Sequence, residues 1–369
     1  MSIVRGSCDL RLPSSAWSVI ADSMTRWRET LRQAPFLRAL GIVLTAWSCS
    51  AFVAVQGCHR ESPQDAKVVT IGYFANLTHA QAVLGVASGE FEKAVSPAKL
   101  DTKVFNAGPS LIEALFAGAI DIGYVGPGPA LSAFTKSGGK GIRVVAGAAA
   151  DGVVVVARKG SGIQSFADLK GRKVGTPQLA NTQDISARHY LTAVLKQTNL
   201  DNVVPVDNAE QASMFSRGEL DAAWAPEPWG QRLISETGAT LVGEEKDLWP
   251  SGELLITLVV TTPEFLAAHG DVVDSVLRVH RTWTQRLAAE PDRYAGPLGD
   301  ALFGLTGKRL APGILPAALK HVRFTDDPGA ATLQTFALWR HDLAFDPAVA
   351  DLNGLVDDAS RKRVAASTP

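Results

Sequence analysis

Short apolar runs alternate with amphipathic helical segments along most of the chain. Residues 67–73, 99–105 and 120–125 are rich in β-branched and other apolar side chains and predict strands. Between them, apolar residues recur at helical spacing over residues 78–87 and again after Gly108, where a proline suits the first turn of a helix. This alternation predicts an α/β fold with largely parallel sheets.

The alternation restarts in the middle of the chain and becomes mainly helical after residue 263. We expect strands at residues 142–147, 152–158, 174–176, 203–206, 220–225 and 254–260, and helices at residues 165–169, 184–197, 209–217, 263–269, 271–289, 312–321 and 330–343. The restart predicts a second α/β unit that is built like the first.

Two segments resemble each other, residues 116–129 and residues 216–229. The aligned pairs are Gly118 with Gly218, Asp121 with Asp221 and Tyr124 with Trp224. Each segment predicts a helix closed by glycine, then a strand with an aromatic residue near its end, then a rigid Gly/Pro loop. Ligands of open α/β sheets bind beyond the carboxyl ends of strands, so the repeat predicts two half-sites facing each other. Two similar turns arising from shared α/β geometry are the alternative.

Composition excludes several classes of protein. The chain has 369 residues, which fits about two ordinary domains. Hydrophobic residues make up 46% and charged residues 20%, which disfavours wholesale disorder and a multi-span membrane protein. Its 36 basic and 37 acidic residues give a net charge of −1, so we expect no nucleic-acid partner.

The first 58 residues read as an export signal. Arginines precede an apolar stretch at residues 39–55, as in a secretory signal. This signal segment closes with Val-Gln-Gly-Cys58. This ending resembles a bacterial lipobox, although Gln56 replaces the usual small or aliphatic residue. It implies lipidation of Cys58, a membrane anchor, and a periplasmic or outer-surface location, with residues 59–66 as a linker. An uncleaved anchor helix is the alternative. No cysteine follows Cys58, which suits an oxidising compartment.

Four motifs together resemble the periplasmic substrate-binding proteins of ABC importers. They lie at residues 71–80, 106–124, 168–174 and 221–229, and the likeness is greatest to binders of nitrate, sulfonates, taurine and thiamine-precursor pyrimidines. The resemblance implies an α/β type II periplasmic-binding-protein fold of two lobes joined by a two-crossing hinge. Lobe 1 would comprise residues 67–157 and 256–369, and lobe 2 residues 158–255. The crossings would lie near residues 156–159 and 254–257.

Candidate ligand-binding residues follow the strands of both lobes. In lobe 1 they are Phe74, Asn76, Thr78, His79, Gly126 and Gly128; in lobe 2 they are Gln178, Asn181, Thr182, Gln183, Asp184, Trp224 and Glu227. Backbone N–H groups at helix starts suit an anionic group, glycine admits a close backbone approach, and tryptophan can wall an apolar part of a ligand. A glutamate opposes a small anion and could accept from an amine or ring N–H. Helix capping and core packing are the alternatives.

Sequence signals for catalysis are weak. The chain has no His-Glu-x-x-His pattern, no Gly-x-Ser-x-Gly elbow and no phosphate-binding loop, so we expect no enzyme, cofactor or metal. We predict a solute-binding lipoprotein that captures a small polar or oxyanionic organic solute, such as an aliphatic sulfonate. It would deliver this solute to an ABC permease and its ATPase. The alternatives are a binder of a thiamine-precursor pyrimidine or other heterocycle, and a secreted enzyme or orphan sensor.

Overall fold

The computed structural model describes residues 68–249 and 252–367. The predicted signal, the lipobox at Cys58 and the linker lie outside the described residues. Within the described part of the chain, the model contains no helix with both the length and the apolar character needed to cross a membrane.

The strands form two sheets, one in each lobe. The first has the order β11-β4-β10-β3-β1-β2 and the second the order β7-β6-β8-β5-β9. The first sheet comprises β1 (Val68–Phe74), β2 (Lys99–Phe105), β3 (Ile122–Val125), β4 (Arg143–Asp151), β10 (Leu255–Thr261) and β11 (Val322–Phe324). The second comprises β5 (Val153–Ala157), β6 (Val174–Thr176), β7 (Val203–Pro205), β8 (Ala222–Pro226) and β9 (Thr240–Glu244).

Both sheets are mixed, so the prediction of largely parallel sheets is only partly right. In the first sheet β1 pairs in parallel with β2 and β3, whereas β10 is antiparallel to β3 and β4. In the second sheet β6 pairs in parallel with β7 and β8, whereas β5 is antiparallel to β8 and β9. The same three-strand parallel unit with an antiparallel neighbour thus occurs twice, as the internal repeat predicts.

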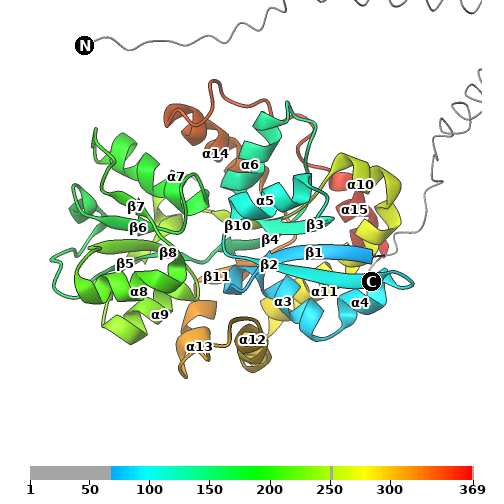
Figure 1. Ribbon diagram of the computed structural model, residues 1–369, viewed down its shortest axis with the longest axis horizontal. Helices are drawn as coiled ribbons and strands as arrows, with labels where there is room; N and C mark the ends of the chain where they lie inside the picture. The colour runs from blue at the N-terminus through cyan, green and yellow to red at the C-terminus, as the bar shows by residue number, and fades with distance from the viewer. Residues whose placement is uncertain (1–67, 250–251, 368–369) are drawn as a thin grey trace, which may run out of the picture. The chain divides into compact units, whose positions relative to one another are not determined.

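Helices connect the strands and follow them. They are α3 (Ala80–Ala87), α4 (Glu90–Val95), α5 (Gly108–Phe116), α6 (Pro127–Lys136), α7 (Thr182–His189), α8 (Asn208–Arg217), α9 (Trp229–Thr237), α10 (Pro263–Ala268), α11 (Gly270–Ala289), α12 (Pro291–Thr306), α13 (Ile314–Leu319), α14 (Ala330–Asp342) and α15 (Asp358–Ser367), with short helical turns η1 (Leu77–His79), η2 (Phe166–Leu169), η3 (Tyr190–Val194) and η4 (Glu245–Leu248). In the first lobe, α5 and α6 cover one face of the sheet and α3 and α11 the other (Figure 1).

The first crossing between the lobes lies earlier than predicted. β5 hydrogen-bonds in the second sheet, so residues 153–157 belong to lobe 2 and not to lobe 1. The chain crosses at Asp151 and Gly152, which have φ angles of 62° and 72°. Residues 142–158 form a nearly unbroken apolar run, so the hydrophobic pattern alone did not reveal where one sheet ends. In the second crossing, the chain passes from η4 in the second lobe to β10 in the first sheet.

The two Gly/Pro segments of the repeat begin helices, which corrects the prediction of rigid loops. α6 starts at Pro127 and α9 at Trp229, directly after the cis Glu227–Pro228 peptide. Proline is tolerated in the first turn of a helix because its missing N–H has no partner there in any case. The repeat therefore places a helix N-terminus, rather than a loop, after β3 and after β8.

Helix α14 joins the two lobes on the side of the second crossing. Trp339 on α14 stacks on His189 of α7, with ring centroids 4.1 Å apart, and its ring lies 4.4 Å from that of Trp249. A single hydrophobic cluster consequently runs from the first sheet through Phe336 and Trp249 to Ile185 in the second lobe. The lobes thus share apolar packing in addition to the two chain crossings.

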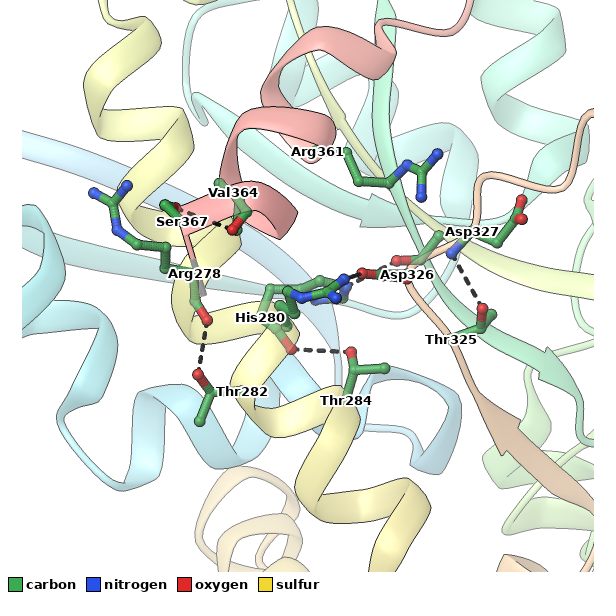
Figure 2. A network of polar contacts seen from close by, with 12 residues as sticks. Arg278, His280, Thr282, Thr284, Thr325, Asp326, Asp327, Arg361, Val364 and Ser367 are labelled. Atoms are coloured by element: carbon green, nitrogen blue, oxygen red, sulfur yellow. Dashed lines mark hydrogen bonds and ion pairs between the residues drawn. The ribbon is translucent and has the colours of Figure 1, made fainter. Parts of the chain in front are cut away.

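Buried histidine and aromatic side chains complete the core. His280 on α11 accepts a hydrogen bond at Nδ1 from the Tyr124 hydroxyl (3.0 Å) and donates from Nε2 to the Gly147 carbonyl (2.8 Å). Burial lowers the pKa of His280 to about 4. Figure 2 shows the surrounding polar contacts, in which the Thr284 hydroxyl donates to the His280 carbonyl oxygen. His280 therefore belongs to the packing of α11 on the first sheet.

Candidate functional site

A small chamber lies between the two lobes, at the carboxyl ends of their parallel strands. Its volume is about 40 Å³. Its wall consists of Phe74, Asn76, Thr78, His79, Asn106, Ala107, Gly108, Gly126, Pro129, Ile256 and Thr257 from the first lobe and Pro177, Asn181, Thr182, Gln183, Asn208 and Pro226 from the second. A cavity of this size holds a group of a few heavy atoms and leaves no room for a ring.

Four α-helices begin at this chamber. α5 and α6 start there from the first lobe, with Ala107 and Gly126 as N-cap residues, and α7 and α8 start there from the second. The wall formed by the described residues contains no lysine, arginine, aspartate or glutamate. The positive ends of the helix dipoles, together with free N–H groups in the first turns of α5, α7 and α8, can therefore stabilise an anion in the chamber. The start of α6 adds no free N–H group, because residues 127 and 129 are prolines and the Gly128 N–H donates to the Thr182 Oγ1.

Side-chain amides add uncharged donors to the wall. The Asn76 Oδ1 accepts from the Thr78 backbone N–H (3.3 Å), and the Asn181 Oδ1 accepts from the Asp184 backbone N–H (2.8 Å). These bonds fix both amide oxygens, so each amide nitrogen is left as a donor. Gln183 is also buried in the wall. Asn181 is the N-cap residue of α7.

His79 is a neutral member of the wall. Its ring stacks on Phe74 with centroids 4.3 Å apart, and its Nδ1 accepts from the Phe74 backbone N–H (3.3 Å). Burial lowers the pKa of His79 to about 3, so the ring carries its single proton on Nε2 at neutral pH. His79 can therefore donate a hydrogen bond, but it brings no positive charge.

Sequence reasoning missed three polar wall residues. The Thr257 Oγ1 on β10 is buried and has no hydrogen-bond partner among the described residues. A lone polar residue in the apolar strand 254–260 was the available signal for it. Asn106 and Asn208 stand where β2 ends and where α8 begins. Both are polar residues at strand–helix junctions, which was the available signal for them. They lie outside the two segments that resemble each other, residues 116–129 and 216–229, so the internal repeat did not point to them.

Gly126 and Gly128 permit a close contact between the lobes. A Cβ atom at Gly126 would lie 2.2 Å from the Thr182 Oγ1, and one at Gly128 would lie 3.0 Å from the Thr182 backbone nitrogen. The Gly128 N–H itself donates to the Thr182 Oγ1 (3.3 Å). The sequence predicted that these glycines let the backbone approach a ligand. In the structure they let it approach Thr182 at the start of α7. Gly126 also lines the chamber, whereas Gly128 does not.

Asp184 and Gln178 are close to the chamber without lining it. The Asp184 carboxylate is buried and accepts from the Thr176 hydroxyl (2.9 Å), the Ala180 N–H (2.9 Å) and the Arg188 Nε (2.8 Å). Asp184 thus fixes the loop that leads into α7. Gln178 lines a neighbouring cavity of about 220 Å³, where its buried Oε1 has no hydrogen-bond partner among the described residues.

Trp224 and Glu227 face away from the chamber. The Trp224 Nε1 donates to the buried Glu245 carboxylate (2.5 Å), and Trp224 packs inside the second lobe. The Glu227 Oε2 accepts from the Gln231 backbone N–H at the start of α9 (3.1 Å). Burial raises the pKa of Glu227 to about 7. The structure therefore assigns neither side chain to the chamber wall, contrary to the expectation of a tryptophan wall and a glutamate acceptor.

Two α/β lobes with this repeated strand order, two crossings and a chamber between strand ends form the fold of the periplasmic binding proteins of ABC importers. The chain belongs to the NMT1-like family, whose model matches residues 62–295. A structural neighbour is the alkanesulfonate-binding protein of Xanthomonas axonopodis pv. citri bound to MOPS, with a TM-score of 0.66 and 23% identity over 79% of this chain and 99% of that one. At this identity the likeness shows the fold.

Two relatives resemble the chain in sequence. One, named as a binding protein of Brucella abortus, is 33% identical over 43% of this chain and 48% of its own length. The chain thus spans about half the length of the curated relatives that it matches at this level. Another, the taurine-binding periplasmic protein of Escherichia coli, is 25% identical over 67% of this chain and 73% of its own length.

Proposed function

We propose that the chain is the substrate-binding protein of an ABC importer and that it binds the head group of a small organic oxyanion, in the first place a sulfonate, between its lobes. The observation that carries this proposal is the start of four α-helices at a chamber walled by uncharged donors. Sulfonate oxygens only accept hydrogen bonds, and helix N-termini stabilise their negative charge without a cation. The names of the taurine- and alkanesulfonate-binding relatives support the same ligand class.

The geometry favours this ligand over a thiamine-precursor pyrimidine. An aminopyrimidine needs acceptors for its amino group, and Glu227 was the residue offered for that role. Glu227 instead accepts a hydrogen bond at the start of α9, and the described wall of the chamber holds no carboxylate.

We further propose that the protein binds its solute without chemical change and passes it to a membrane permease. The two lobes would part and close about the crossings at Gly152 and after η4, so that the solute enters and is then shielded from water. Membership of the NMT1-like family supports a binding role. Export and lipidation at Cys58 remain part of this proposal, because those residues lie outside the described part of the chain.

Thermal unfolding and calorimetric titration test the ligand class. The probes are methanesulfonate, taurine, nitrate, benzenesulfonate and an aminopyrimidine. A probe at about 100 times its dissociation constant adds roughly 2.7 kcal/mol to the free energy of unfolding, which appears as a rise of several degrees. We expect at least one sulfonate to stabilise the protein. Stabilisation by the aminopyrimidine alone, or by no anion, would overturn the proposal.

A charge-inserting variant locates the site. Asn181→Asp keeps the shape of the side chain and its ability to cap α7, because aspartate and asparagine are similar N-cap residues. It places a negative charge in the chamber wall, so we expect sulfonate binding to fall at least about tenfold while the unfolding temperature of the free protein stays unchanged. Asn353→Asp, at an exposed asparagine outside the chamber wall, is the matched control.

A further inference from the structure

A larger groove adjoins the chamber. It has a volume of about 270 Å³ and shares Phe74, Asn76, Asn106 and Asn208 with the chamber wall. A cavity of about 150 Å³ already suffices for a benzene ring. The head-group chamber and the groove therefore form two adjacent compartments of very different size, both bounded by the two lobes.

The groove is largely apolar and partly aromatic. Phe105 and Val104 at the end of β2 line it from the first lobe, together with Leu305 near the end of α12. Trp229 at the start of α9 lines it from the second lobe. Val104 and Leu305 are 44% and 38% exposed, although both are large apolar side chains. Apolar side chains that gather in a groove beside a polar binding site indicate a ligand with an apolar part.

Basic side chains lie where the groove meets a second small cavity that shares no wall residue with the chamber. Lys308 lines the groove, and the small cavity adds Arg232 and Arg309. Arg232 lies over the Trp229 ring, 5.1 Å from its centroid, and pairs with Glu236, while Arg309 pairs with Asp300. Within the described residues, Lys308 has no carboxylate at ion-pair distance, since none of the ion pairs there includes it. The groove wall also contains one carboxylate, Asp207, at the start of α8.

We propose that the groove holds the apolar, preferably aromatic, body of the ligand whose oxyanion head occupies the chamber, with Lys308 facing the far end of that body. The ligand class is then an arylsulfonate or a similarly bulky organic oxyanion, rather than nitrate, methanesulfonate or taurine. This inference rests on the proposed function, because it takes the chamber to be the site of the head group. An aromatic ring packs well against Phe105 and Trp229, and a second acidic group on the ring suits Lys308.

Calorimetric titration of the purified protein with four probes tests the inference. Methanesulfonate has a head group alone, taurine adds an ammonium, benzenesulfonate adds a ring, and 4-sulfobenzoate adds a ring with a distal carboxylate. Burial of a phenyl ring predicts that benzenesulfonate binds about tenfold to 100-fold more tightly than methanesulfonate. We expect 4-sulfobenzoate to bind at least as tightly as benzenesulfonate. We expect taurine to bind more weakly than benzenesulfonate.

Two groove variants and one control assign the effect to residues. Leu305→Asn removes apolar surface from the groove, so it should reduce the advantage of benzenesulfonate over methanesulfonate by at least about threefold and leave methanesulfonate binding unchanged. Lys308→Gln should weaken 4-sulfobenzoate and spare benzenesulfonate. Leu338→Asn, at a similarly exposed leucine on α14 (43%), should alter neither ratio.

The outcomes separate this inference from the function on which it rests. If methanesulfonate binds and benzenesulfonate binds no more tightly, or if Leu305→Asn leaves the ratio unchanged, the groove does not hold the ligand body, while the oxyanion chamber stands. If no sulfonate binds at all, the proposed function fails and this inference fails with it.

Discussion

Replacement of Gly126 by alanine tests whether the lobes close as the structure has them. Gly126 has φ −75° and ψ 160°, which alanine adopts without strain, so the first lobe itself should fold normally. The added Cβ would lie 2.2 Å from the Thr182 Oγ1 of the other lobe and 3.3 Å from the Ile256 carbonyl oxygen. Since such atoms normally stay more than about 3 Å apart, the lobes must part by roughly 1 Å at this point.

The expected cost falls on the closed state alone. Overpacking of this kind typically costs about 1–3 kcal/mol, which lowers the closed-to-open ratio roughly fivefold to 150-fold. The apparent affinity for a ligand held between the lobes falls by the same factor once the open state predominates. Thr182 offers little relief, because a β-branched side chain in a helix has few rotamers and its Oγ1 accepts from the Gly128 N–H.

Two measurements check this prediction. The first is calorimetric affinity for the sulfonate that binds best to the unaltered protein. The second is the distance between spin labels on exposed positions of the two lobes, Glu113→Cys on α5 and Glu210→Cys on α8. The labels are specific in a chain whose three native cysteines, all within residues 1–58, are replaced. We expect lower affinity and a label distribution shifted to longer distances in the ligand-free state.

Controls decide how the result is read. Gly296→Ala on α12 adds a methyl group with no neighbour within 4 Å and should change neither measurement. Thr182→Ala removes the clashing oxygen, so combining it with Gly126→Ala should recover part of the lost affinity. Unchanged affinity and label distances in Gly126→Ala, with normal folding, would refute the argument that the closed lobes meet at this glycine.

Three further predictions concern buried polar groups. Glu227→Gln tests a carboxyl whose pKa is raised by burial to about 7, so its stabilising contribution is full below about pH 4.5 and is lost as the pH rises through 7. We therefore expect the free energy of unfolding of the variant, measured in urea, to rise relative to that of the unaltered protein between pH 5 and pH 8. The rise should be at most roughly 3 kcal/mol. A difference between the two proteins that stays constant with pH would contradict this. Thr257→Val removes a hydroxyl that is buried without a hydrogen-bond partner among the described residues. We expect calorimetry to show about tenfold lower sulfonate affinity, with no fall in the unfolding temperature of the ligand-free protein. A loss of stability with full affinity would argue for a structural role. Trp224→Phe removes the N–H group that donates to the Glu245 carboxylate. We expect the free energy of unfolding in urea to fall by about 1–3 kcal/mol and the sulfonate affinity to stay unchanged. A loss of affinity without a loss of stability would place Trp224 in the binding site.

The internal repeat shows how far residue pattern alone could reach. The pairing of Asp121 with Asp221 is structural in both lobes: the Asp121 carboxylate accepts from the Thr70 N–H (2.8 Å) and the Asp221 carboxylate from the Lys173 N–H (3.1 Å). The pairing of Tyr124 with Trp224 is structural too, since each donates to a buried partner in its own lobe. The sequence therefore revealed the duplication correctly, but it suggested a ligand role for an aromatic residue that serves the core.

The candidate site divides in a similar way. Polar residues at strand–helix junctions, such as Asn76 and Asn181, were recognisable because the carboxyl ends of parallel strands gather at one edge of a sheet. Glu227 follows a strand in the same manner and precedes a cis peptide to Pro228. Its carboxylate nevertheless accepts from the Gln231 N–H at the start of α9 and does not face the chamber. The direction of a side chain at such a junction depends on the local backbone, which periodicity does not encode.

The sequence by itself determined the α/β class, the two repeated lobes and most of the strands and helices, because those follow from the local spacing of apolar residues and from helix-starting and helix-ending residues. Only the tertiary structure decided that β5 belongs to the second sheet, that Gly126 and Gly128 meet the start of α7, and that Thr257 faces the chamber. Each of these depends on contacts between residues far apart in the chain. Strand pairing, the fit between the lobes and the facing of a side chain emerge only when both lobes are packed together.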